Sequence, residues 1–307
     1  MTISSATIGT EWFLNGTSNL QQQMLETQRQ LSSGFRVQDA ADSPSQTAEI
    51  VDLGSTLAAV QNYQSKLVRV QVEASSADQT LGSAISLLDS ARTLAAQAAN
   101  TTATASDLKT ISNQIQGIQQ QLTSIANSKI EGRYIFGGNL DQTAPYSFDP
   151  TTGTITAATS TVSDRVITDP QNQAVYQALT AQQIFDPQDA AGASTGSSTF
   201  AALQGLQAAL AAGSQSGIAA SLTALQSASA WLNQQQAYYG QSEQRLSAEQ
   251  NSAANQATAL QTRIAAIRDT DVTQAATDLA QETTTQAAAM GAEAEIAQQR
   301  NLFSYLG

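Results

Sequence analysis

Apolar residues recur every three or four positions over two long stretches of the chain, a pattern typical of helices that pack along one another. The first stretch runs from Leu53 to Ala99 and the second from Leu222 to Ile267. Each predicts one long helix with an apolar seam. We expect the two helices to pack into a rod whose core contains these seam residues: Leu53, Val60, Leu67 and Leu88 in the first stretch, and Leu232, Leu246, Leu260 and Ile264 in the second.

The second position of each predicted seam is polar over several turns. It is occupied by Gln64, Gln71 and Asp78 in the first stretch, and by Ser229, Gln236, Glu243 and Gln250 in the second. Polar seam residues lower the stability of a helix pair while specifying its register. The pattern therefore predicts an antiparallel bundle of long helices that gains further support from neighbouring molecules.

A shorter helix is predicted after a Thr- and Ala-rich break at 100–105, with Ser106 as its N-cap. Its seam is regular, and we expect Ile111, Ile115 and Ile118 to belong to the same core. This helix should pack back on the first long one.

Glycine and proline change the character of the chain between residues 132 and 200. Short β-like runs at 154–156 and 165–167 flank turn signals, and a short helix is predicted near 174–184. We interpret Gly137-Gly138 as a backbone turn that leads out of the rod. The predicted fold is mainly α: an elongated antiparallel long-helix bundle, a coiled-coil-like rod, with a small β-containing inserted domain.

The two ends of the chain carry thinner apolar stripes, interrupted by Ala, Gln and Thr. Such helices bury too little apolar surface to fold stably alone, so the termini should be helical or disordered in the monomer. Their expected partners are the same segments of neighbouring copies. The residues expected at this subunit interface are Phe13, Leu20, Met24, Leu31, Met290, Leu302, Phe303 and Leu306.

These patterns divide the chain into five segments. They are an N-terminal assembly segment (1–45), N-terminal rod helices (46–131), the inserted outer domain (132–200), one C-terminal rod helix (201–268) and a C-terminal assembly segment (269–307).

The amino-acid composition argues against several classes of function. The chain has no His and no Cys, so it lacks the commonest general base and the usual ligands of zinc. Its 25 acidic and 13 basic residues give a net charge of −12, and the basic residues form no run. This argues against nucleic acid as a partner. No stretch approaches the ~20 apolar residues of a membrane span, and the N-terminus lacks the pattern of a Sec-type signal. We predict a structural protein without catalytic residues, cofactor or metal.

Four segments resemble motifs of flagellins and flagellar hook-associated proteins. They are Leu31–Asp42 (LSSGFRVQDAAD), Ser90–Asn100 (SARTLAAQAAN), Arg268–Val272 (RDTDV) and Asn301–Leu306 (NLFSYL). The resemblance covers both helical halves in the same order. Two further features, Asp42-Ser43-Pro44 and Gly132–Gly138 (GRYIFGG), resemble the hook–filament junction members of this family more than its filament-forming members.

The resemblance implies a structural component of the bacterial flagellum that joins hook to filament. The alternatives are a short filament-forming flagellin and, more distantly, a non-flagellar secreted helical adhesin. The implied partners are other flagellar axial subunits: the chain itself, the adjoining hook-associated protein and flagellin. The resemblance also implies an export chaperone at the C-terminal segment and export through the flagellar channel without a cleaved signal peptide. The motif adds Arg36 to the expected interface, although a solvated charge explains this residue equally well.

Overall fold

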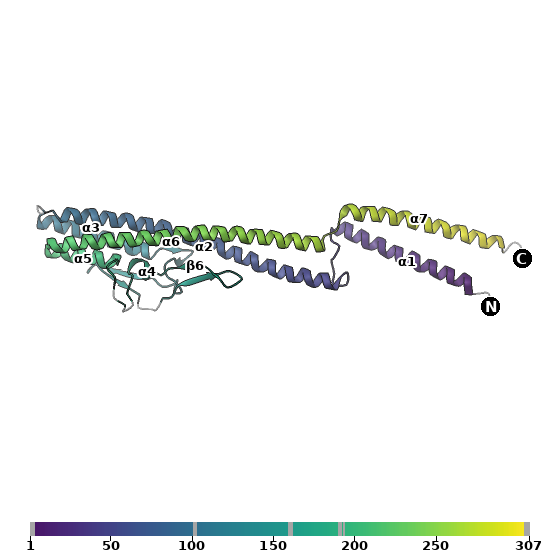
Figure 1. Cartoon of the computed structure of the whole chain (residues 1–307), viewed down its shortest axis with the longest axis horizontal. Helices are drawn as coiled ribbons and strands as arrows, with labels where there is room; N and C mark the ends of the chain where they lie inside the picture. Colours follow the sequence, from purple (N-terminus) through teal and green to yellow (C-terminus); the bar gives the residue numbers. More distant parts are fainter. Residues whose placement is uncertain (1–3, 101–102, 159–161, 190–191, 193, 304–307) are drawn as a thin grey trace. The chain divides into compact units, whose positions relative to one another are not determined.

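Helices dominate the structure, a computed structural model that describes residues 4–100, 103–158, 162–189, 192 and 194–303 (Figure 1). The described residues form seven helices and three small strand pairs, which confirms the predicted mainly α class with a β-containing insert. The chain divides into two units. The first unit comprises Met1–Ala58 with Gln256–Gly307, and the second comprises Ala59–Asn255.

The two longest helices are α2 (Pro44–Ala98) and α6 (Gln215–Arg268). They run antiparallel in the second unit, where they lie side by side (Figure 1). Gln215 near the start of α6 donates to the carbonyl of Ala98 at the end of α2 (3.4 Å), and further along α6 the Gln236 side chain lies next to Gly82 of α2. The numbering of the two helices thus advances in opposite directions along the pair.

The buried stripe of α2 differs from the predicted seam at its second position. The first position is as predicted, with Val60, Leu67, Leu81 and Leu88 buried. The second position lies one residue earlier than predicted, so Gln64, Gln71 and Asp78 only flank the core and are half-buried. The residues that occupy it are Tyr63, Val70, Ala77, Ala84, Ala91 and Ala98. The prediction of a polar seam in α2 is therefore wrong: this seam is apolar and rich in alanine.

The buried stripe of α6 also lies one residue earlier than predicted at its second position, but it includes polar residues. Its buried stripe alternates Ile218, Leu225, Leu232, Tyr239 and Leu246 with Ser221, Ala228, Gln235 and Ser242. Gln236 and Glu243 are half-buried beside it. Ser229, a predicted polar seam residue, is buried, and the other polar groups inside the helix pair lie at positions that were not predicted.

Most of the residues predicted for the rod core are buried: Leu53, Val60, Leu67, Leu88, Ile111, Ile115, Ile118, Leu232 and Leu246. Leu260 and Ile264 are only half-buried. These two side chains lie in the last turns of α6, within the first unit.

The segment 201–268 holds two helices rather than the single helix predicted. Helix α5 (Thr199–Ala212) ends at Gly213, which adopts a left-handed conformation (φ 64°), before α6 begins. Helix α5 packs on α3 (Ala105–Ala126). The N-cap of α3 is Thr104, not Ser106 as predicted, because Thr104 and Asp107 form a reciprocal capping box.

The insert contains three antiparallel hairpins: β1 (Lys129–Ile130) with β2 (Arg133–Tyr134), β3 (Tyr146–Asp149) with β4 (Thr154–Ala157), and β5 (Arg165–Thr168) with β6 (Ala174–Ala178). The strands predicted at 154–156 and 165–167 are confirmed as β4 and β5. The helix predicted near 174–184 is wrong in its first half, which is strand β6; only α4 (Ala181–Phe185) is helical.

An aromatic cluster packs the insert against the helices. Phe136 contacts Phe185 and Tyr239 edge-on, with ring centroids 5.8 and 6.4 Å apart, and all three rings are buried. The turn after Phe136 requires glycine: Gly138 has φ 54°, and a Cβ there would collide with the carbonyl oxygen of Ser163. The predicted turn at Gly137-Gly138 is therefore confirmed.

Candidate assembly site at the chain ends

The two terminal helices pair with each other inside the first unit. Helix α1 (Ser4–Ser33) and helix α7 (Val272–Phe303) lie side by side (Figure 1). The half-buried stripe of α1 contains four of the predicted interface residues, Phe13, Leu20, Met24 and Leu31. These side chains therefore belong to a helix pair within one chain.

Helix α7 meets α1 through a face that the sequence analysis did not predict. Its shielded positions are Ala275, Leu279, Glu282, Gln286 and Ala289, and the Thr27 hydroxyl donates to Glu282 (3.3 Å). The predicted interface residue Met290 lies on another face and is 60% exposed. Leu302 and Phe303 lie in the last turn of α7, and Leu306 lies outside the described residues.

Large apolar side chains remain exposed on these helices. Trp12 is 82% exposed, Leu14 and Leu25 also project into solvent from α1, and Met290 does so from α7. Burying these side chains against another molecule would be favourable, because it removes apolar surface from water. Leu14 and Leu25 were not predicted as interface residues, because they fall outside the regular stripe.

Two of the motifs that resembled flagellar proteins meet at the base of this helix pair. Residues 34–37 and 267–270, which we call the clasp, form backbone hydrogen bonds with each other. The amide of Arg36 donates to the carbonyl of Arg268 (2.7 Å), and the amide of Thr270 donates to Gly34 (3.0 Å). The clasp thus ties the end of α1 to the start of α7.

Side chains reinforce the clasp. The Arg36 guanidinium donates to the carbonyl of Ile267 (2.9 Å), so this residue serves an intrachain contact. The Arg268 guanidinium stacks over the Phe35 ring, 4.1 Å from its centroid. Gly34 has φ 76° and ends α1, a conformation that favours glycine. The sequence analysis missed the Phe35–Arg268 contact, although both residues stand in the quoted motifs.

Asp42 organises the loop between α1 and α2. Its carboxylate accepts hydrogen bonds from the amides of Gln38 (2.9 Å) and Asp39 (3.0 Å) and from Arg29 (3.0 Å). The two amide hydrogen bonds, followed by the charge of Arg29, hold the pKa of Asp42 below its usual value. Pro44 then opens α2, at the position where a helix tolerates proline.

Asp271 caps α7. Its carboxylate accepts from the amides of Thr273 (2.9 Å) and Gln274 (3.1 Å). Within the part of the chain that the structure describes, no cluster of three or more acidic side chains is placed to hold a metal.

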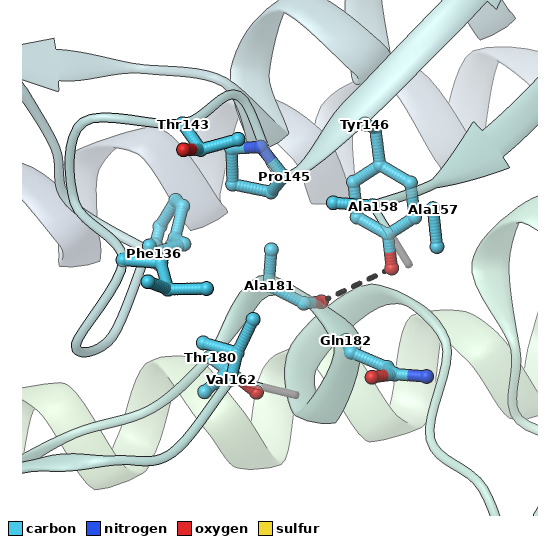
Figure 2. A pocket seen from close by; sticks show the side chains of 12 residues that line it. Phe136, Thr143, Pro145, Tyr146, Ala157, Ala158, Val162, Thr180, Ala181 and Gln182 are labelled. Atoms are coloured by element: carbon cyan, nitrogen blue, oxygen red, sulfur yellow. Dashed lines mark hydrogen bonds between the residues drawn. The ribbon is translucent and has the colours of Figure 1, made fainter. Parts of the chain in front are cut away.

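The insert holds a small cavity between the β3–β4 hairpin and helix α4 (Figure 2). Phe136, Pro145, Tyr146 and Ala181 line it, and the Tyr146 hydroxyl donates to the carbonyl of Ala181 (3.5 Å). Its volume of about 20 Å³ is enough for one water molecule and too small for an organic substrate.

Among the described residues, no helix is both long enough and apolar enough to cross a membrane.

Two family models match the chain: the bacterial flagellin N-terminal helical region over residues 10–141, and the bacterial flagellin C-terminal helical region over residues 222–306. No curated protein sequence matches it.

Among solved structures, the chain is similar to a protein described as a flagellar hook-associated protein from Vibrio parahaemolyticus, with 20% identity and a TM-score of 0.62 over 74% of this chain and 99% of that one. It is also similar to flagellar hook-associated protein 3 from Legionella pneumophila, with 14% identity and a TM-score of 0.57 over 72% and 99% of the chains. For FlgL from Bacillus cereus the identity is 19% and the TM-score 0.52, over 71% and 100%. At these identities the likeness concerns the fold.

Proposed function

Because the chain belongs to the bacterial flagellin family, we propose that it is a structural subunit of the bacterial flagellum that joins hook to filament. One observation carries the proposal: the two regions that match the family models include most of α1 and all of α7, and the clasp holds these two helices together as a pair. The shared fold with hook-associated proteins supports the junction role over a filament role.

Assembly follows from what the paired helices leave exposed. Burying the apolar surface around Trp12, Leu14, Leu25 and Met290 against neighbouring subunits would stabilise the contact by about 25 cal/mol per Å². In an open helical assembly each contact joins two different surfaces, so the two faces of the helix pair meet different neighbours. For a junction subunit, these neighbours include the adjoining hook-associated protein on one side and flagellin on the other.

The proposal assigns no catalytic role to the chain. It includes export through the flagellar channel, and it places an export chaperone on the C-terminal segment around Leu302, Phe303 and Leu306. The apolar character of this segment supports such a contact.

A short filament-forming flagellin is the second candidate. It is favoured by the family models themselves, both of which describe flagellin regions. The two candidates differ in whether the protein polymerises without other subunits.

Seeded growth separates them. Purified protein is mixed with sheared filament fragments, and growth is followed by light scattering and electron microscopy. A junction subunit is expected to leave filament length unchanged and to bind the ends of isolated hooks. Long filaments that contain only this chain would show a flagellin instead, and failure to bind hooks or filaments would contradict both candidates.

A further inference from the structure

A cationic groove lies in the second unit, between helix α2 and two hairpins of the insert. Lys66 and Arg69 reach it from α2, Arg133 from β2 and Arg165 from β5, while Val70 and Ile167 form part of an apolar wall. Its volume is about 250 Å³. Four of the 13 basic residues of a chain with a net charge of −12 thus gather at one groove.

Internal carboxylates neutralise only part of this charge. Arg165 forms an ion pair with Glu73 and lies 3.7 Å from Asp141, and Arg133 lies 3.3 Å from the same Asp141 carboxylate. Lys66 and Arg69 take part in no ion pair among the described residues, and Glu131 is the other acidic residue in the lining. Two cations on one face of α2 are therefore available to a ligand.

The floor of the groove is partly shielded from water. Burial raises the pKa of Glu73 although Arg165 lies beside it, so the charges here are desolvated. Charge pairs are stronger in such surroundings than on an open surface. A ligand that carries both a negative charge and apolar groups would use the cations and the apolar wall together.

We propose that this groove receives a carboxylate-bearing segment of a neighbouring copy of the chain. The inference rests on the proposed function, because it requires copies to stand side by side in an assembly. Chains that each carry a net charge of −12 repel one another unless cationic surfaces meet acidic ones. Contacts in an open assembly are heterologous, so the groove of one copy meets a different and acidic surface of the next.

Charge reversal at Lys66 tests the contact in the assembled organelle. Cells produce Lys66→Glu or Lys109→Glu in place of the natural chain, and the amount of protein on isolated hook–filament complexes is measured. Lys109 is a matched control, because it is also an exposed lysine on a helix of the second unit and has no ion pair among the described residues. We expect Lys66→Glu to lower the retained amount by about tenfold or more, since like charges at an interface disfavour binding strongly. Lys109→Glu should change it little, and circular dichroism of both purified variants checks that they fold.

Zero-length cross-linking identifies the occupant. A carbodiimide joins amines to carboxylates in contact, and Lys66, Lys109 and Lys129 are the only lysines of the chain. Complexes that contain isotopically labelled and unlabelled copies should give hybrid cross-links from Lys66 to an Asp or Glu of the other copy.

The outcomes separate this inference from the proposed function. If the natural chain is absent from the complexes, the proposed function fails. If it is present and Lys66→Glu is retained as well as Lys109→Glu, the groove contact is wrong. Cross-links from Lys66 to another protein would also overturn it. So would a groove that takes only a free anion, shown by inorganic phosphate raising the melting temperature of the natural chain but not of Lys66→Glu.

Discussion

Gln119 offers a sharp test of the packing in the second unit. The side chain belongs to α3, its residue is 0% exposed, and neither amide atom has a hydrogen-bond partner within the described residues. A buried polar group without a partner lowers the free energy of unfolding by about 1–3 kcal/mol. Removing the amide while keeping the shape of the side chain should therefore stabilise the protein.

Gln119→Met makes this change. Methionine is unbranched, has a similar volume, and has nearly the same helix propensity as glutamine, so repacking should cost less than about 1.5 kcal/mol. We expect the free energy of unfolding to rise by about 1 kcal/mol or more. Gln120→Met is a matched control, because Gln120 is the next residue of α3 and is exposed; its effect should stay within about 0.5 kcal/mol.

Urea unfolding followed by tryptophan fluorescence measures the difference. The chain has two tryptophans. Trp231 donates to the carbonyl of Ile184 (3.0 Å) and so reports on α6 and the insert, whereas Trp12 is largely exposed and changes little on unfolding. A higher midpoint with an unchanged slope would show a gain in stability. A loss of more than about 1 kcal/mol in Gln119→Met, with Gln120→Met neutral, would refute the reasoning and show that the amide is hydrogen-bonded.

Three further predictions concern the turn at Gly138, the clasp and the loop of Asp42. Gly138→Ala should lower the free energy of unfolding by about 2–5 kcal/mol, because the cost of the left-handed backbone adds to the cost of the steric clash. Gly132→Ala should lower it by only about 1–2 kcal/mol, because Gly132 has φ 81° but no atom within 4 Å of the added Cβ. Equal losses for the two variants in urea unfolding would contradict the clash. Arg268→Ala should weaken the clasp by about 0.5–1 kcal/mol, because the stacking on Phe35 is lost, and this should appear as faster proteolysis of α1 and α7. Arg268→Lys should weaken the clasp less. Equal proteolysis rates for the two variants would exclude the stacking. The Asp42 carboxyl should titrate below the ordinary pKa of an aspartate side chain in a carbon NMR titration. Its ionised form is the stabilised one, so its contribution is complete above the unfolded-state pKa and is lost as pH falls through the lower folded-state pKa; Asp42→Asn should abolish this dependence.

The long helices were predictable from the sequence, but the position of their second seam was not. Large apolar residues spaced by multiples of seven identify the first position of the buried seam, as Val60, Leu67, Leu81 and Leu88 do in α2. The partner position can lie three or four residues later, and in α2 the buried set is mainly alanine, which has no strong apolar signal. The larger apolar side chains Leu57 and Ile85 lie at the alternative position, four residues after the first, and are only half-buried. A run of alanines at heptad spacing was the available signal.

The insert and the chain ends show a second limit of the sequence. Residues 174–178 have helix-forming alanine and glutamine but form a strand, because pairing with β5 places Val175, Tyr176 and Ala178 in the core. Tertiary packing here overrides local propensity. At the ends, the residues of α1 that were predicted to contact neighbouring subunits meet α7 of the same chain. The face of α7 that meets them contains Glu282 and Gln286, which a hydrophobic pattern does not identify.

The helix pair of the second unit combines a buried apolar seam with buried polar groups that lower its stability, a combination that suits an exported subunit. Its apolar seam positions are fully shielded, yet the hydroxyl of Tyr63 and one oxygen each of Gln71 and Glu243 are buried without a hydrogen-bond partner among the described residues. Each such group lowers the free energy of unfolding. Burial of the Glu243 carboxyl, with Asp78 nearby, also raises its pKa. Under the proposed function the chain must unfold to pass a channel and is then held by neighbours. A pair of helices with these unpaired groups opens more easily before assembly than an apolar zipper would, and contacts with neighbouring subunits can supply the stability that the monomer lacks.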